Sequence, residues 1–149
     1  MSLNFSDVNL QINCLSPLET AANKFSAFLW RADCKDRSSE DKKKNDPTIV
    51  RHFYDLYKLQ TVITENKADF YNLILKIYED DKTRGDKTNN LSLKSFSNST
   101  LEKIQSDSLY EKEYMDFVNN MVYKNSDIKN YSIVLENYAK LIQQIENYS

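Results

Sequence analysis

Lys24 and Arg31 are the pair of cations in this chain whose spacing most readily serves chemistry. They lie seven residues apart in a segment with helical periodicity, so both side chains fall at the edge of one apolar stripe. A lysine point charge beside an arginine fork can hold a triphosphate. Cations at such a boundary are also commonly solvated at the end of their extended stems, with no ligand at all. The spacing alone leaves both interpretations open.

A second group combines Arg51 and Asp55 with His52, the single histidine of the chain. Asp55 falls nearly opposite the apolar face of its predicted helix, but Leu59 and Val62 lie beside it, so this side can face a cleft or another domain. The alternative is a surface ion pair between Arg51 and Asp55, four residues apart, beside a histidine without chemical function.

Complete catalytic or metal-binding sets are missing from the sequence. There is no Ser-His-Asp arrangement, and no Asp-x-Asp follows a Gly-Ser turn, so we predict no metal ligands in this chain. Cys14 and Cys34 are too far apart for a CxxC pair, and we expect both to be free reduced thiols. The run from Lys42 to Lys44 is a solvated loop by default, with contact to an RNA backbone as the second interpretation.

Composition indicates one mainly helical domain. The 149 residues include only 1 Gly and 2 Pro, which argues against an all-β fold. A formal charge of -2 gives no global attraction to nucleic acid or to a membrane. No apolar stretch is long enough to span a bilayer and no signal peptide is present, so we expect a cytoplasmic protein without a membrane partner.

One β-strand is predicted at the N-terminus, where apolar and polar residues alternate from Asp7 to Leu15. A lone strand leaves its backbone groups unpaired, so it must join a sheet that this chain does not visibly supply. We therefore expect residues 1–15 to be the linker and terminal strand of a preceding domain, and residues 16–149 to form the helical domain.

The helical part is predicted to be a bundle of about five to six helices. The first begins at Ser16-Pro17-Leu18-Glu19, with serine as N-cap, proline at the first helical position and glutamate closing a capping box. A polar loop follows from 33 to 46, and the stretch from Asp81 to Ser97 is a second predicted loop. The expected helices, judged by apolar spacing, span about 17–32, 47–64, 67–81, 99–106, 108–124 and 127–147.

Two stretches together resemble a known family. Leu15-Ser16-Pro17-Leu18-Glu19-Thr20 leads to the segment from Lys24 to Arg31, and Arg51-His52-Phe53-Tyr54-Asp55-Leu56-Tyr57-Lys58-Leu59 follows. They resemble the third and fourth motifs of the AbiEii/AbiGii-type nucleotidyltransferase toxins, which belong to type IV toxin-antitoxin and phage-defence systems. The family's first two motifs, a Gly-Ser turn and a metal-binding Asp-x-Asp, lie upstream of these. The chain thus resembles the C-terminal part of such an enzyme.

The resemblance implies roles for individual residues. Lys24 and Asp55 would be catalytic, and Arg31, Arg51 and His52 would bind substrate. The full-length enzyme would use Mg²⁺ and a nucleoside triphosphate (NTP), would modify an acceptor such as tRNA, and would have a cognate antitoxin. Residues 1–149 alone are expected to be inactive, because the metal-binding carboxylates are absent. The alternative is a non-enzymatic helical module that binds RNA, a nucleotide or another protein.

Overall fold

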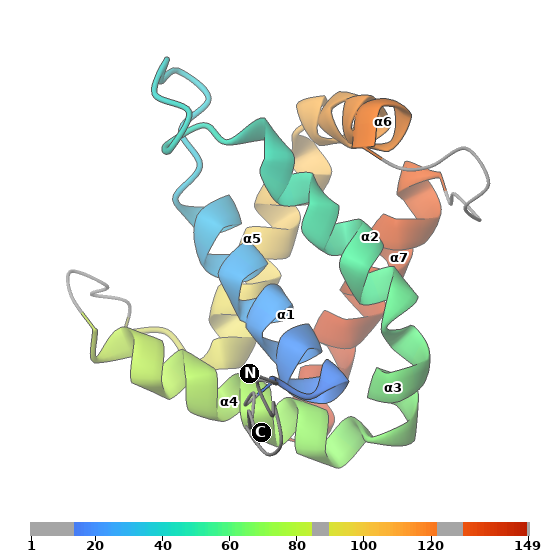
Figure 1. Cartoon of the computed structure of the whole chain (residues 1–149). Helices are drawn as coiled ribbons and strands as arrows, with labels where there is room; N and C mark the ends of the chain where they lie inside the picture. The colour runs from blue at the N-terminus through green and yellow to red at the C-terminus, as the bar shows by residue number, and fades with distance from the viewer. Residues whose placement is uncertain (1–13, 85–89, 122–129, 149) are drawn as a thin grey trace, which may run out of the picture.

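The computed structural model describes residues 14–84, 90–121 and 130–148, and these residues form helices and loops without a β-strand. Figure 1 shows the helices gathered around α1. In chain order they are α1 (Pro17–Asp33), the 3₁₀ helix η1 (Pro47–Val50), α2 (Arg51–Lys58), α3 (Gln60–Glu65), α4 (Lys67–Lys82), α5 (Leu93–Ser106), α6 (Leu109–Met121), α7 (Tyr131–Gln144) and the 3₁₀ helix η2 (Ile145–Asn147).

The capping box predicted for α1 is confirmed. The Glu19 backbone N–H donates to Ser16 Oγ at 3.1 Å, and the Ser16 N–H donates to Glu19 Oε2 at 2.8 Å. These two bonds satisfy helix-end donors that would otherwise be left without partners, and Pro17 occupies a first-turn position where no N–H is needed. The start of α1, and hence the rotation of its side chains, is set locally by the sequence.

α1 is the central helix of the fold and packs against α2, α3, α4 and α5. Its buried residues extend around most of its circumference: Ala21, Ala22, Phe25, Ser26, Phe28, Leu29, Trp30 and Ala32. Phe28 joins it to α2, with its ring 4.5 Å from that of Phe53, and to α7, with its ring 5.0 Å from that of Tyr138. Aromatic pairs at these separations stabilise beyond simple area burial. This aromatic contact fixes how α2 lies against α1.

The single helix predicted over 47–64 is wrong in detail, because the segment contains three short helices. Asp46 caps the first, accepting from the Thr48 N–H at 2.8 Å, as its position before Pro47 predicts. The break between α2 and α3 falls at Leu59, with φ −91° and ψ 3°. No glycine or proline marks that position, so local sequence gave no signal for it.

Two further predictions need correction. The loop predicted from Asp81 to Ser97 is too long, because α5 begins at Leu93 rather than near residue 99. Ser92 is its N-cap and accepts from the Ser95 N–H at 3.2 Å. The described residues hold seven α-helices, one more than the upper end of the predicted number.

The predicted strand over 7–15 falls mostly on residues 1–13, which lie outside the described residues. Cys14 and Leu15, its last two positions, are in no regular element. The strand, and with it the domain boundary at residue 15, stays a prediction.

Candidate phosphate-binding site

Lys24 of α1 and Asp55 of α2 are in direct contact. Lys24 Nζ donates to Asp55 Oδ2 at 2.6 Å, and their side chains are 30% and 29% exposed. The two residues are 31 positions apart in the chain, and the packing of Phe28 on Phe53 holds their helices together. The surface ion pair considered between Arg51 and Asp55 is replaced by this contact between helices.

His52 lies directly beside this ion pair and is only 5% exposed. Its pKa is lowered to about 4, mainly by burial and also by the charges of Lys24, Arg51 and Arg31, while Asp55 opposes this shift. His52 is therefore neutral at pH 7. The other four residues predicted to form the site all act electrostatically on His52.

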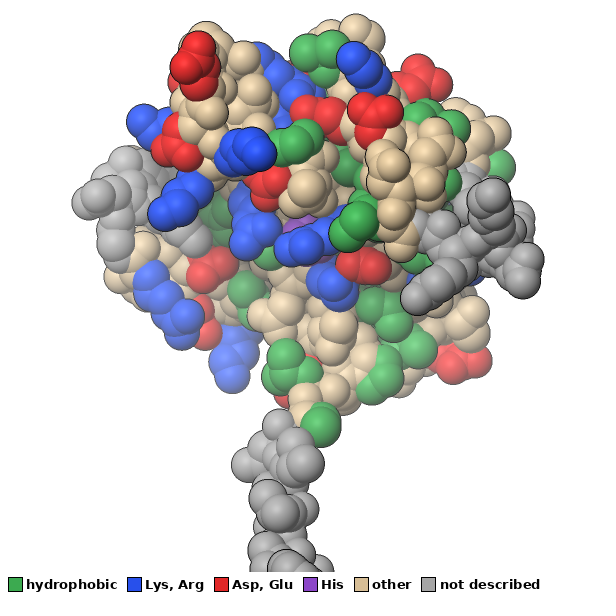
Figure 2. Space-filling model, turned by 45° about the horizontal axis from the view of Figure 1, so that its top comes forward, with side chains coloured by type: hydrophobic (Ala, Val, Ile, Leu, Met, Phe, Trp, Pro, Cys, Tyr) green, Lys and Arg blue, Asp and Glu red, His purple; other side chains and the backbone are tan. Residues whose placement is uncertain are grey.

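The site contains cationic side chains that form no salt bridge and a histidine whose ring nitrogens form no hydrogen bond within the described residues. Arg31 and Arg51 are exposed, and neither forms a salt bridge with any residue that the structure describes. Within the same described ranges, neither ring nitrogen of His52 has a hydrogen-bond partner. Figure 2 shows Lys and Arg side chains gathered around the single histidine and over the left half of that face.

A phosphate group would satisfy these unused groups. Three cations, Lys24, Arg31 and Arg51, stand against the single carboxylate of Asp55, which leaves a formal excess of two positive charges. Arginine forks match the oxygens of phosphate, and lysine adds a point charge. The arrangement is that of an anion site.

A divalent metal does not fit the same residues. Among residues 14–84, 90–121 and 130–148 no three His, Cys, Asp or Glu side chains are grouped as metal ligands. Mg²⁺ prefers several oxygen ligands in octahedral geometry, and among the described residues Asp55 supplies the only carboxylate paired with Lys24. Cys14 and Cys34 are exposed free thiols.

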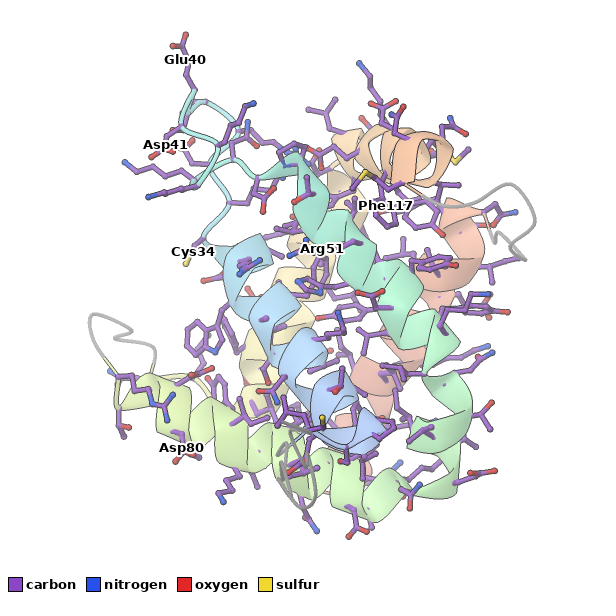
Figure 3. The ribbon with its side chains drawn as sticks, in the orientation of Figure 1. Cys34, Glu40, Asp41, Arg51, Asp80 and Phe117 are labelled. Atoms are coloured by element: carbon purple, nitrogen blue, oxygen red, sulfur yellow. The ribbon has the colours of Figure 1, made fainter. Side chains whose placement is uncertain are left out.

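A larger cavity, which we call the basic pocket, adjoins the site and was not predicted as a unit. It has a volume of about 880 Å³ and shares Arg31 with the site. Figure 3 labels Cys34 at the end of α1, Asp41 in the following loop and Asp80 on α4, the three elements around it. It is lined by Asn23, Ser26, Ala27, Trp30, Arg31, Cys34, Lys35, Lys42, Lys43, Lys44, Asp46, Ile49, Ile77, Asp80, Asp81 and Arg84. The run of three lysines was its sequence signal.

The loop that forms one wall of the basic pocket is anchored by ion pairs that sequence reasoning missed. Arg37 Nε donates to Asp107 Oδ2 at 2.6 Å, and the same guanidinium pairs with Glu113 of α6. Lys35 Nζ lies 3.3 Å from Glu113 Oε1 and donates to the Asp46 carbonyl at 2.5 Å. We call Lys35, Arg37, Asp107 and Glu113 the loop anchor. Its partners are about seventy residues apart in sequence, so no spacing rule could reveal it.

These observations define a helical domain in which three cations and a buried histidine surround one carboxylate. The family model for the nucleotidyl transferase AbiEii toxin of type IV toxin-antitoxin (TA) systems matches residues 2–141. The chain belongs to this family, as its motifs around Lys24 and Asp55 predicted. Membership implies a nucleotidyltransferase toxin, with a nucleotide substrate and an antitoxin partner.

Other comparisons add no relatives. No curated protein and no solved structure gives a significant match to the chain. In the part of the chain that the structure describes, no helix is both long and apolar enough to cross a bilayer.

Proposed function

We propose that this helical region holds the triphosphate of an NTP in a nucleotidyltransferase that transfers a nucleotide to an acceptor such as tRNA. Lys24 and Asp55 are the proposed catalytic residues, and Arg31, Arg51 and His52 the proposed substrate-binding residues. The observation that carries the proposal is the 2.6 Å contact between Lys24 and Asp55, made beside two arginines without salt bridges in the described chain.

Asp55 holds Lys24 in place before the substrate arrives. A half-exposed lysine would otherwise sample many rotamers, and fixing it in advance reduces the entropy lost on binding. Phosphate oxygens then compete with Asp55 Oδ2 for the ammonium group, while the two arginines supply bidentate donors. Neutral His52 packs beside the pair and adds no further charge to the site.

The division between two domains is part of this proposal. Residues 1–15 would end a preceding nucleotidyltransferase domain, and residues 16–149 would be the helical domain. Mg²⁺, which in such enzymes offsets charge on the phosphates, would be held by carboxylates of the preceding domain, because the described helices offer no suitable group. The helical domain then contributes binding and orientation.

We call Lys24, Arg31, Arg51, His52 and Asp55 the phosphate site. Proton NMR of His52 tests it directly, because the chain has only one histidine. Inorganic triphosphate bound between Lys24 and the arginines favours the charged imidazole, so the pKa of His52 should rise by at least about 1 unit. In Lys24→Ala the triphosphate concentration needed for this shift should increase about tenfold or more, the cost of a lost charged hydrogen bond.

Lys112→Ala is the matched control, since Lys112 is an exposed lysine on α6 and is not among the charges that shift the pKa of His52. It should respond to triphosphate as the parent chain does. The proposed triphosphate site would be contradicted if the His52 titration did not change on adding triphosphate. It would also be contradicted if Lys24→Ala and Lys112→Ala had equal effects.

Transfer itself is measured as incorporation of radiolabel from an NTP into tRNA. Residues 1–149 should bind triphosphate without transferring label. Label transfer by this chain alone would contradict the proposed division between domains, while leaving the phosphate site intact.

A further inference from the structure

The basic pocket concentrates positive charge on an otherwise acidic chain. Its lining holds six cations and three carboxylates, a formal +3, so the rest of the chain, at -2 overall, carries a formal −5. Lys35 and Asp46 contact each other, and removing both leaves the same +3 from the remaining side chains. Such a local concentration attracts polyanions even when the net charge does not.

The cations come from three separate parts of the chain: Arg31 from α1, Lys42 to Lys44 from the following loop, and Arg84 from the turn after α4. A ligand with one compact charge could not reach all of them across a cavity of about 880 Å³. A ligand with phosphates at regular intervals could. The half-buried Ile77 lines the same cavity and adds apolar surface beside these charges.

We propose that the basic pocket binds the phosphodiester backbone of a single-stranded polynucleotide through Lys42, Lys43, Lys44 and Arg84, with Arg31 at the junction to the phosphate site. A cavity of about 880 Å³ has room for a few nucleotides of a single strand and not for a duplex, which favours a single strand. The assignment of this polynucleotide as the acceptor rests on the proposed function. Binding in the pocket does not.

The loop anchor keeps the lysine wall in place. The three lysines repel one another, and their loop has no regular structure to resist that repulsion. Arg37 and Lys35 fasten its first half to α6 through Glu113, and the Asp36 N–H donates to the Lys44 carbonyl at 2.9 Å. Glu113 is thus a positioning residue for the pocket.

Filter binding of a labelled single-stranded RNA of about 12 nucleotides, a typical site size, tests the proposal at several salt concentrations. The triple variant Lys42→Ala/Lys43→Ala/Lys44→Ala should bind at least about tenfold more weakly. Its salt dependence should fall by about 2 in the slope of log K against log salt, as three phosphate contacts to a single strand predict.

The matched control replaces Lys76, Lys112 and Lys140, three exposed lysines outside the pocket, by alanine. Both triple variants bring the formal charge from -2 to −5, so a global field would weaken both equally. The control should bind RNA within about twofold of the parent chain, a difference below 0.5 kcal/mol. An equal loss of RNA affinity in the two triple variants would overturn the proposal that RNA binds in the basic pocket. So would a lack of RNA binding by the parent chain at low salt.

Two competitors and one variant separate the remaining outcomes. Duplex RNA or polyglutamate competing as well as single-stranded RNA would overturn the assigned ligand. Lys24→Ala should keep RNA binding while losing the triphosphate effect on His52, and the lysine triple variant should do the reverse. Failure of the proposed function thus leaves RNA binding measurable, and failure of the pocket leaves the His52 titration measurable.

Discussion

The phosphate site and the loop anchor are built from the same kinds of residues but differ in how their charges balance. In the loop anchor, Lys35 and Arg37 face Asp107 and Glu113, two cations against two carboxylates. In the phosphate site one carboxylate faces three cations. The balanced group holds a loop, and the unbalanced group is left with charge for a ligand. Charge balance within a cluster therefore distinguishes a structural role from binding more clearly than residue type does.

The largest effect should come from the aromatic contact that holds α2 against α1. Phe53→Ala removes a fully buried ring that touches Phe28 and Tyr138, and should lower the free energy of unfolding by about 3–5 kcal/mol. Urea denaturation measures the loss. A change below about 1 kcal/mol would mean that α2 does not depend on this contact for its place beside α1.

Glu113→Gln should disrupt the loop anchor and lower the free energy of unfolding by about 3 kcal/mol, because it leaves the nearly buried Lys35 without its carboxylate. The Lys35 side chain is 3% exposed and that of Glu113 is 14% exposed. Burial already lowers the pKa of Lys35, and Glu113 opposes this effect. Urea denaturation of Glu113→Gln against the exposed control Glu111→Gln measures the difference. Similar midpoints for the two variants would contradict the structural role of the loop anchor.

Acidification should weaken the fold through His52. Its pKa is about 4 in the folded protein and near 6.5 when unfolded, so the unfolded state binds the proton first and stability falls as the pH drops through 6.5. Between about pH 7 and pH 5 the loss should be about 2 kcal/mol. Denaturation at the two pH values should show this loss in the parent chain, and a much smaller one in His52→Gln. An equal loss in both would assign the pH dependence to other groups.

The smallest change in stability is expected for substitutions in the phosphate site. Asp55→Asn should alter the free energy of unfolding by less than about 1 kcal/mol, since a half-exposed ion pair contributes little. Lys24→Ala should behave likewise, while both variants abolish activity of the intact enzyme. Denaturation together with label transfer by the intact enzyme checks this. Destabilisation as large as that of Phe53→Ala would indicate that the Lys24–Asp55 pair is structural.

The sequence predicted elements whose signals are local. Two helix starts were predicted and are confirmed: the capping box of Ser16 and Glu19, and the Asp46 cap before Pro47. The start of α5 was missed because Ser92 caps it within a polar stretch, although Leu93 and Phe96 already show helical spacing and are buried. The break at Leu59 follows from packing, which local sequence does not contain.

For the candidate site, the resemblance supplied what spacing could not. Nothing in the residues alone placed Lys24 against Asp55, 31 positions away, and the motifs singled both out. The exposure of Arg31 and Arg51 and the burial of His52 required the fold. The loop anchor had no signal at all, because Arg37 and Glu113 meet only through the packing of α6 near η1.

Trp30, the only tryptophan, gives this chain a built-in optical probe. Its indole lines the basic pocket and stacks on Tyr78, with ring centroids 5.6 Å apart and planes 17° from parallel. Excitation of the ten tyrosines should pass by energy transfer to this one emitter, whose spectrum reports the polarity of the pocket floor. A polynucleotide bound in the pocket would change the surroundings of this residue and hence its emission, so occupancy of the pocket can be followed in unlabelled protein.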